Sequence, residues 1–294
     1  MRNLFSIEGK VALVTGGSRG IGEMIAAGFL ANGAKVYISS RKAQVCDSTA
    51  TRLSAEYDAE CISIPADLSN VEGCTLLASE LASREDKLDI LINNAGVSWG
   101  APIDEFPEIG WDKVFDTNVK GVFFLTQKLL PQLRASASSQ DPARVINIGS
   151  IDGLKNPAFE TFSYGSSKAA VHHLTRSLAL HLTKENIICN AIAPGPFPTW
   201  MLSTGVGGGG DTDIDVSASS GSGALTLSSK VSLVSANASA SATSRTAFKT
   251  ASDFTSGEDI TVDKTETFVY ERSADAFKTA NSILCWMGRQ EQAK

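Results

Sequence analysis

The sequence lacks the cysteine pattern of a disulfide-stabilised secreted domain or of a structural zinc site. It contains five cysteines, an odd number, and none of them forms a Cys-x-x-Cys pair. It also lacks an excess of basic residues. Its formal net charge of -6 disfavours nucleic acid and anionic membranes as partners, because neither polyanion attracts an acidic surface. These absences favour a small-molecule partner and a reducing, cytoplasmic setting.

Long hydrophobic runs are also missing. The apolar stretch at residues 121–130 is interrupted by Gln127 and Lys128, and it is much shorter than the ~20 residues that a membrane-spanning helix needs. The start of the chain has no apolar segment typical of a secretory signal, because a strand-like run begins at Val11. We therefore expect a soluble protein. Its 294 residues, 43% of them hydrophobic, suffice for one large or two smaller α/β domains.

Short β-branched segments alternate with longer amphipathic segments in the first two thirds of the chain. Parallel strands that are covered by helices on both faces are apolar almost throughout, as these short segments are. The pattern predicts an α/β fold with a Rossmann-type, doubly wound parallel sheet. Six of the strands usual in such a sheet are recognisable, at residues 10–15, 35–39, 60–65, 88–93, 144–149 and 187–193.

The composition changes after residue 204. Residues 205–256 are rich in Gly, Ser, Thr and Ala, which is typical of a linker or a disordered segment. Residues 257–294 regain charged and aromatic residues and contain one candidate helix at residues 273–287. We therefore divide the chain into a core at residues 1–204, a linker, and a tail of unknown structure, and expect residues 205–294 to be largely disordered.

A glycine-rich segment follows the first predicted strand and opens a helix. It reads Val14-Thr15-Gly16-Gly17-Ser18-Arg19-Gly20-Ile21-Gly22. Its glycines permit a tight turn, the close approach of a pyrophosphate, and close packing of the helix. For the motif alone, a turn that merely needs positive φ stays open as the alternative. A P-loop is excluded, because no Gly-Lys-Ser/Thr ends the segment.

The second predicted strand ends without an acidic residue, in Ile38-Ser39-Ser40-Arg41. An acid at this place would bind the ribose hydroxyls of NAD and would repel a 2′-phosphate. Arg41, together with Arg19 in the glycine loop, can instead bind the 2′-phosphate through charge-assisted hydrogen bonds. A solvated surface charge is the commoner role of a single arginine, but the pair predicts NADP(H) rather than NAD(H).

A tyrosine and a lysine four residues apart form the strongest signal of chemistry. Tyr164 and Lys168 share one face near the start of a helix, where the ammonium favours the phenolate. A free tyrosine titrates near ~10 and needs such help to exchange a proton at neutral pH. Ser150 follows the fifth predicted strand, where α/β proteins bind ligands, and can hold a substrate oxygen. Asn118 lies in the preceding long helix, where its amide can bend the helix and hold a water beside Lys168. Each residue alone also suits a structural role, but together they predict one catalytic cleft.

These motifs, in order and spacing, resemble those of the short-chain dehydrogenase/reductase family. The matching positions are residues 15–22, 93–96, Asn118, Ser150, Tyr164 with Lys168, and 194–195. The resemblance covers residues 5 to about 202. Within the family, residues 98–101, 110–114 and 143–150 are similar to the rhamnolipid-type 3-oxoacyl-[acyl-carrier-protein] reductases and their fungal relatives. The resemblance implies NADPH-dependent reduction of a ketone to a secondary alcohol, with a 3-oxoacyl thioester as the expected substrate and a homodimer or tetramer as the assembly.

The resemblance also implies a role for each matching residue. Asn118, Ser150, Tyr164 and Lys168 correspond to a catalytic tetrad in which Tyr164 carries the proton. The cofactor-binding residues, with the two arginines discussed above, are Gly16, Ser18, Arg19, Gly20, Ile21, Gly22, Arg41, Asp67, Leu68, Asn94, Ala95, Gly96, Tyr164, Lys168, Pro194, Gly195 and Thr199. Candidates to line an acyl site are Trp99, Phe159, Phe162, Trp200 and Met201.

Other chemistries do not fit the sequence. It contains no Gly-x-Ser-x-Gly motif of a serine hydrolase. His172, His173 and His181 lack the spacing of metal ligands and are expected to be core or surface residues. Residues 211–222 begin like a calcium loop but lack its glycine and its final glutamate. We expect no metal ion.

The resemblance ends before the last third of the chain. Family members continue after the Pro-Gly segment with a substrate-covering loop, a further helix and a seventh strand, and residues 203–294 contain no recognisable counterpart. Two alternatives therefore stay open beside the ketone reductase. One is a sugar or polyol dehydrogenase of the same family. The other is an inactive or misfolded product of an aberrant gene model that lacks the last helix and strand.

Overall fold

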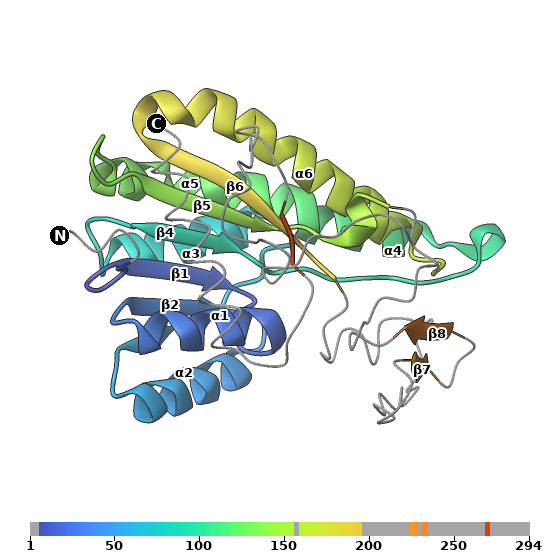
Figure 1. Ribbon diagram of the computed structural model, residues 1–294, viewed down its shortest axis with the longest axis horizontal. Helices are drawn as coiled ribbons and strands as arrows, with labels where there is room; N and C mark the ends of the chain where they lie inside the picture. The colour runs from blue at the N-terminus through green and yellow to red at the C-terminus, as the bar shows by residue number, and fades with distance from the viewer. Residues whose placement is uncertain (1–5, 156–158, 196–223, 228–230, 235–267, 271–294) are drawn as a thin grey trace, which may run out of the picture.

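The computed structural model describes residues 6–155, 159–195, 224–227, 231–234 and 268–270. Helices and strands alternate along the chain (Figure 1). The first six strands are β1 (Val11–Thr15), β2 (Lys35–Ser39), β3 (Cys61–Ser63), β4 (Ile90–Asn93), β5 (Ala143–Ile148) and β6 (Ile187–Pro194). The α-helices are α1 (Gly20–Ala31), α2 (Ala43–Tyr57), α3 (Val71–Ala82), α4 (Glu108–Phe115), α5 (Gly121–Ser136) and α6 (Phe162–Leu182).

The large sheet is parallel and has the strand order β3-β2-β1-β4-β5-β6-β9, with β9 at Phe268–Tyr270. The chain first adds strands on one side of β1, as far as β3, and then crosses back to add β4 on the other side. The carboxyl ends of β1 and β4 therefore flank the point where the winding direction switches, and this is where ligands bind in open α/β sheets. The predicted Rossmann-type, doubly wound sheet is confirmed.

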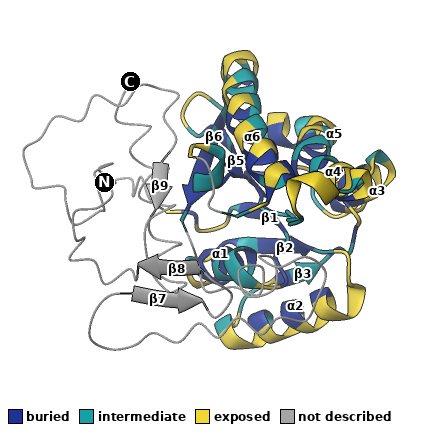
Figure 2. Cartoon of the chain, turned by 90° about the vertical axis from the view of Figure 1, so that its right-hand side faces the viewer, coloured by how far each residue is buried: buried dark blue, intermediate teal, exposed yellow. Residues whose placement is uncertain are grey.

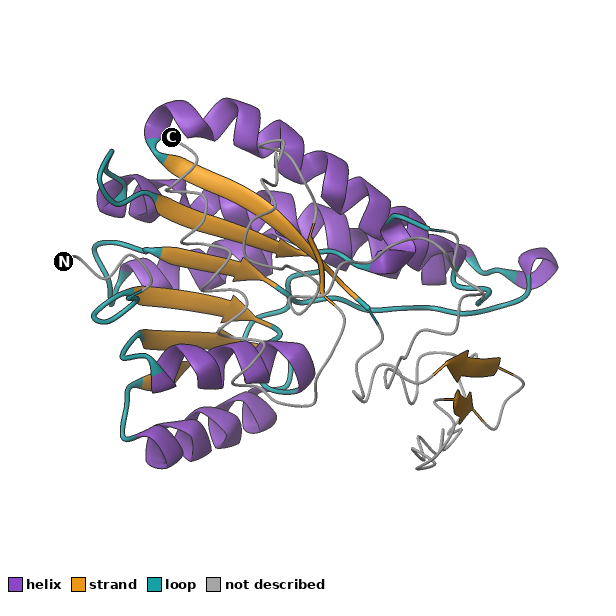
Figure 3. Cartoon of the chain, viewed as in Figure 1, coloured by secondary structure: helices purple, strands orange, loops and turns teal. Residues whose placement is uncertain are grey.

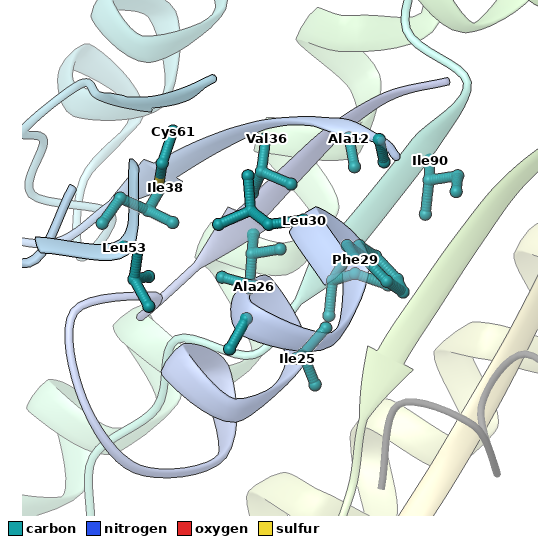
Figure 4. Close-up of a cluster of buried hydrophobic side chains, with 14 of the residues drawn as sticks. Ala12, Ile25, Ala26, Phe29, Leu30, Val36, Ile38, Leu53, Cys61 and Ile90 are labelled. Atoms are coloured by element: carbon teal, nitrogen blue, oxygen red, sulfur yellow. The ribbon is translucent and has the colours of Figure 1, made fainter. Parts of the chain in front are cut away.

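The strands are apolar on both faces because helices cover both faces. In β4 the fully buried side chains alternate, with Ile90 and Ile92 in one core cluster and Leu91 in the other. Phe29 of α1 and Leu53 of α2 belong to the same cluster as Ile90 and Ile92, on one face of the sheet (Figure 4). Helices α3, α5 and α6 supply the apolar side chains of the second cluster, so the sheet lies between two helical layers (Figure 3). The sandwich holds the carboxyl edge of the sheet in a defined position.

Burial follows this layering. Exposed residues gather on the outer surfaces of α2, α3 and α4, whereas the strands are mostly buried (Figure 2). Among the described helices, none combines the length and the apolar character that a membrane crossing requires.

The last third of the chain differs from the expectation at two places. A seventh strand was not expected there, yet β9 pairs in parallel with β6 from Ile192↔Phe268 to Pro194↔Tyr270. Three residues are too few for a periodic signal, so only the pairing with a distant strand identifies this segment. Within the expected linker, β7 (Ala224–Leu227) and β8 (Val231–Val234) pair antiparallel. The candidate helix at residues 273–287 lies outside the described residues.

Candidate active site

The glycine loop connects the carboxyl end of β1 to the start of α1. Gly16 has a φ of 64°, a left-handed conformation that favours glycine. At Gly22, an added Cβ would lie 2.3 Å from the carbonyl oxygen of Gly16 and 2.4 Å from Nδ2 of Asn94. Helix α1 therefore packs so closely on its own loop that only glycine fits at position 22. Its free N-terminal N–H groups lie beside the loop, as binding of a pyrophosphate requires.

Asn94 and Thr15 join the ends of β4 and β1. The backbone N–H groups of Asn94 and Ala95 both donate to Oγ1 of Thr15, each at 3.0 Å. Nδ2 of Asn94 donates to the carbonyl oxygens of Thr15 at 2.9 Å and Gly16 at 3.3 Å. Gly96 follows, and a Cβ there would lie 3.3 Å from Oδ1 of Asn118 and 3.5 Å from Nζ of Lys168. The Asn-Ala-Gly segment thus links the glycine loop to the expected catalytic residues.

The end of β2 carries polar atoms that the described part of the protein does not use. The hydroxyls of Ser39 and Ser40 are buried and have no hydrogen-bond partner among the described residues. Two exposed arginines lie at the neighbouring strand ends: Arg41 lies just after β2, and Arg19 lies in the glycine loop after β1. Unpaired buried hydroxyls are unfavourable, and they are suited to a polar ligand here. No acid is present to repel a phosphate at positions 39–41, so the residues fit NADP(H).

The remaining residues predicted to bind the cofactor differ in their exposure to solvent, and one of them lies outside the described residues. Asp67 is exposed, and its Oδ1 accepts a hydrogen bond from the Ser69 N–H at 3.0 Å. The Leu68 side chain is buried in the core and is not available to a ligand. Pro194 ends β6 and Gly195 follows it. Thr199 lies outside the described residues, as do Trp200 and Met201.

Helix α6 places Tyr164 and Lys168 one turn apart. Lys168 is only 5% exposed; its Nζ lies 5.6 Å from the centre of the Tyr164 ring and donates to the carbonyl oxygen of Ile148 at 2.8 Å. This bond ties α6 to the end of β5, where Ser150 follows. The predicted arrangement of a tyrosine and a lysine on one helical face beside this strand end is therefore present.

Ser150 is the N-cap of the 3₁₀ turn Ile151–Gly153. Its Oγ accepts a hydrogen bond from the Asp152 N–H at 3.1 Å, which orients the hydroxyl. The Ser150 side chain also lies near enough to the Tyr164 hydroxyl to lower its pKa. The two hydroxyls that a substrate oxygen would need are thus neighbours, although their residues come from different elements.

Asn118 lies in a π-helical turn, Asp116–Lys120, between α4 and α5. Its Oδ1 accepts from the Val97 N–H at 2.8 Å, while Nδ2 donates to the Val97 carbonyl at 3.0 Å and to Oγ of Ser167 at 3.0 Å. The expected local distortion of the helix is present. The expected role of the amide changes, because both Nδ2 hydrogens bind the protein and one lone pair of Oδ1 is all that stays for a water. The side chain anchors the loop that follows β4.

The two ionisable groups have shifted pKa values. Burial raises the pKa of Tyr164 to about 12; the hydrogen bond from Ser150 lowers it and the charge of Asp152 raises it by smaller amounts. Burial lowers the pKa of Lys168 to about 8. We expected Lys168 to lower the Tyr164 pKa. In the structure desolvation dominates instead, so Tyr164 holds its proton at neutral pH, while Lys168 titrates at a pKa of about 8.

Of the expected acyl-site aromatics that the structure describes, Trp99 is half-buried and Phe162 is exposed. The Trp99 indole packs on Gly110, where a Cβ would lie 2.7 Å from the ring, and Lys113 lies 5.3 Å above it. Phe162 makes an edge contact with Phe106, at 5.9 Å between ring centres.

Two residues near the site were not singled out from the sequence: Asp152, which raises the Tyr164 pKa, and Ser167, which binds Asn118. No motif marks either residue, because both act through neighbours that only the fold provides.

The fold and this site define a dinucleotide-dependent oxidoreductase. The family model described as short chain dehydrogenase matches residues 10–205. The chain is 54% identical over 201 residues to the rhamnolipids biosynthesis 3-oxoacyl-[acyl-carrier-protein] reductase of Pseudomonas aeruginosa, covering 68% of this chain and 78% of that protein. It is 34% identical over 202 residues to 2-dehydro-3-deoxy-D-gluconate 5-dehydrogenase of Dickeya dadantii, covering 67% and 75%.

Solved structures give the same result. The RhlG/NADP active-site complex of Pseudomonas aeruginosa matches with a TM-score of 0.66 and 54% identity, over 68% of this chain and 78% of that one. The L-sorbose reductase of Gluconobacter frateurii, complexed with NADPH and L-sorbose, matches with a TM-score of 0.63 and 29% identity, over 68% and 74%. The chain therefore belongs to the short-chain dehydrogenase/reductase family.

Proposed function

We propose that this protein reduces a ketone to a secondary alcohol with NADPH, and that its substrates are 3-oxoacyl thioesters carried by coenzyme A or acyl carrier protein. The proximity of the Ser150 and Tyr164 side chains, beside buried Lys168, carries this proposal. The substrate class follows from the 54% identity to a 3-oxoacyl reductase. The similar solved structure of the RhlG/NADP complex supports the choice of cofactor.

The chain's own residues can hold such a cofactor along the carboxyl edge of the sheet. Gly16 to Gly22 would bind the pyrophosphate at the start of α1, and Ser39, Ser40, Arg41 and Arg19 would bind the adenosine end with its 2′-phosphate. Asp67, Leu68, Asn94, Ala95 and Gly96 would border the adenine and its ribose, and Pro194, Gly195 and Thr199 the nicotinamide. When bound, NADPH supplies the hydride that reduces the carbonyl carbon.

Ser150 and Tyr164 act on the substrate oxygen. Their two hydroxyls hold this oxygen, and Tyr164 keeps its proton at neutral pH because its pKa is raised to about 12. The proton passes to the oxygen as negative charge develops there. Lys168, protonated below its pKa of about 8, stabilises the phenolate that forms. Asn118 holds the loop that borders this site and, through Ser167, the helix that carries Tyr164.

Tyr164→Phe tests the assignment. NADPH consumption with 3-oxoacyl-CoA substrates should fall about 100-fold or more, since general acid catalysis contributes that much, while the Kd for NADPH stays within about twofold. Tyr57→Phe, which changes a half-buried tyrosine at the end of α2, is the matched control. Unchanged turnover of the Tyr164 variant would show that another group donates the proton.

A substrate panel separates this reading from a sugar or polyol dehydrogenase, for which the 34% identity to a sugar-acid dehydrogenase is the supporting observation. The panel pairs 3-oxoacyl-CoA esters of several lengths with ketoses and keto sugar acids. A higher kcat/KM for the sugars than for the 3-oxoacyl-CoA esters would favour the sugar or polyol dehydrogenase. An inactive product would show no cooperative thermal transition that NADPH shifts upward.

The setting and assembly belong to the same proposal. Four of the cysteines are free and buried, which supports a cytoplasmic, reducing environment. Exposed apolar side chains on α4, α5 and α6, among them Trp111, Phe123 and Leu180, support a homodimer or tetramer that pairs these helices. Light scattering of the purified protein distinguishes these states from a monomer.

A further inference from the structure

His172 continues the helical face that carries the catalytic pair. It lies one turn beyond Lys168 and two turns beyond Tyr164 on α6, so the three side chains share one side of the helix. His172 is 3% exposed, and its Nε2 lies 3.1 Å from the carbonyl oxygen of Ser150. The sequence alone suggested only a core or surface histidine.

The segment around Ser150 is shaped to receive this imidazole. A Cβ at Gly149 would lie 2.2 Å from Cε1 and 2.7 Å from Nε2 of His172. A Cβ at Gly153 would lie 2.6 Å from the backbone carbon of Lys168 and 2.9 Å from Cδ2 of His172. Neither glycine has a positive φ, so backbone conformation does not require glycine at these positions. Gly149 therefore leaves room for the ring, and Gly153 leaves room for the backbone of α6 as well as for the ring.

The hydrogen bond determines the tautomer. A carbonyl oxygen can only accept, so Nε2 carries the hydrogen and Nδ1 is left with a lone pair. Nδ1 is buried and has no partner among the described residues. Burial first, and then the charges of Lys168 and Arg176, keep the His172 pKa below its usual value, so the ring stays neutral. A buried unpaired acceptor is unfavourable, and an apolar residue would avoid it. The polar ring is therefore explained by the bond that it donates.

That bond connects two parts of the site. Three backbone N–H groups already donate hydrogen bonds in this segment: Gly149 to the Ile192 carbonyl, Gly153 to the Ser150 carbonyl, and Asp152 to Oγ of Ser150. None of them reaches α6, where Tyr164 lies. Lys168 makes one link, to Ile148, but its ammonium also serves the proton transfer. His172 provides the link at Ser150 itself and contacts no reacting atom.

We propose that His172 is a positioning residue, whose Nε2–H holds the Ser150 carbonyl and thereby sets the distance between the Ser150 and Tyr164 hydroxyls. This inference rests on the proposed ketone reduction, in which both hydroxyls bind the substrate oxygen. Misplacing a reacting group by about 1 Å can reduce a rate by about 100-fold. Loss of the bond should therefore act on kcat and leave the distant glycine loop unaffected.

His172→Phe removes the donor and keeps an aromatic ring, whereas His172→Gln places an amide nitrogen about as far along the side chain as Nε2. His173, the exposed neighbour, supplies the matched controls His173→Phe and His173→Gln. We expect His172→Phe to reduce kcat for 3-oxoacyl-CoA reduction about 10- to 100-fold, with the Kd for NADPH within about twofold. His172→Gln should regain most of kcat, and both controls should match the parent protein.

A folded His172→Phe variant with the parent kcat would overturn the inference, as would a His172→Gln variant no better than His172→Phe. If His172→Phe does not fold, the double variant Gly149→Ala with His172→Ala serves instead, because the Cβ at position 149 occupies space that the ring leaves empty. This variant should fold with a similarly reduced kcat. A double variant with the parent kcat would also overturn the inference. Imidazole ¹⁵N shifts of His172 read the tautomer without any turnover, and an Nδ1–H ring would refute the bond. A parent protein that reduces no ketone, yet shows the Nε2–H tautomer, would locate the failure in the proposed function.

Discussion

Replacing Gly22 by alanine tests how closely the glycine loop and α1 must pack. The new Cβ would lie 2.3 Å from the carbonyl oxygen of Gly16, and real contacts of this kind stay beyond 3.0 Å. The obstacle is backbone and cannot rotate away, so α1 must move by roughly 0.7 Å or the loop must open. The same Cβ would lie 2.4 Å from Nδ2 of Asn94, which donates to Thr15 and Gly16.

The expected cost has two parts. Overpacking of this kind destabilises a folded protein by about 1–3 kcal/mol. The shift also moves the first N–H groups of α1 away from the pyrophosphate, so the Kd for NADPH should rise about tenfold, which corresponds to about 1.4 kcal/mol. Because Tyr164 and Lys168 lie on another helix, kcat at saturating NADPH should change much less than the Kd.

Urea unfolding and NADPH fluorescence titration measure the two parts separately. Gly9→Ala is the control for a destabilised protein with an intact loop, because Gly9, unlike Gly22, has a positive φ, of 72°, and a Cβ there meets nothing within 4 Å. It should show the cost of backbone strain without a change in the Kd. A Gly22→Ala variant that binds NADPH as tightly as the parent protein would show that the loop does not hold the pyrophosphate as proposed.

Two further predictions concern the catalytic residues. Burial lowers the Lys168 pKa to about 8, so raising the pH from about 7 to 9 removes the ammonium charge beside Tyr164, and kcat for reduction should fall through this range. Lys168→Arg keeps the positive charge, so its kcat should not change with pH over this range, whatever the rate. A parent kcat that does not change with pH would contradict the lowered pKa of Lys168. Asn118→Ala leaves the Val97 N–H and carbonyl unpaired, which should cost about 2 kcal/mol of unfolding free energy in urea. Asn70→Ala, which removes the N-cap of α3, should cost only about 1 kcal/mol.

The sequence was most informative where local pattern and long-range packing agree. The six strands of the core were recognisable because both faces of each are buried, which leaves an apolar run with sharp ends. Tyr164 and Lys168 were recognisable because helical periodicity alone brings residues four apart together. The glycine loop was recognisable because its backbone tolerates few side chains.

Other features depend on partners that are distant in the chain. The segment β9 is three residues long and becomes a strand only by pairing with β6. The direction of the Tyr164 pKa shift could not be predicted, because its largest cause is desolvation by the assembled site. His172 appeared to be an ordinary histidine because its hydrogen bond and the two glycines that flank it come from another element. Propensity contains no information on such contacts.

A buried polar network beneath the site shows the same dependence on distant partners. Nδ2 of Asn93, at the end of β4, donates to Asn147 at 2.9 Å and to Thr126 at 3.0 Å, and Asn147 in turn donates to Thr175 at 2.9 Å. All four residues are nearly inaccessible to solvent, so the network stabilises the core no more than well-packed apolar side chains would. Its hydrogen bonds, however, allow only one register between β4, β5, α5 and α6. Since β5 leads to Ser150 and α6 carries Tyr164, the proximity of the two hydroxyls depends on this register.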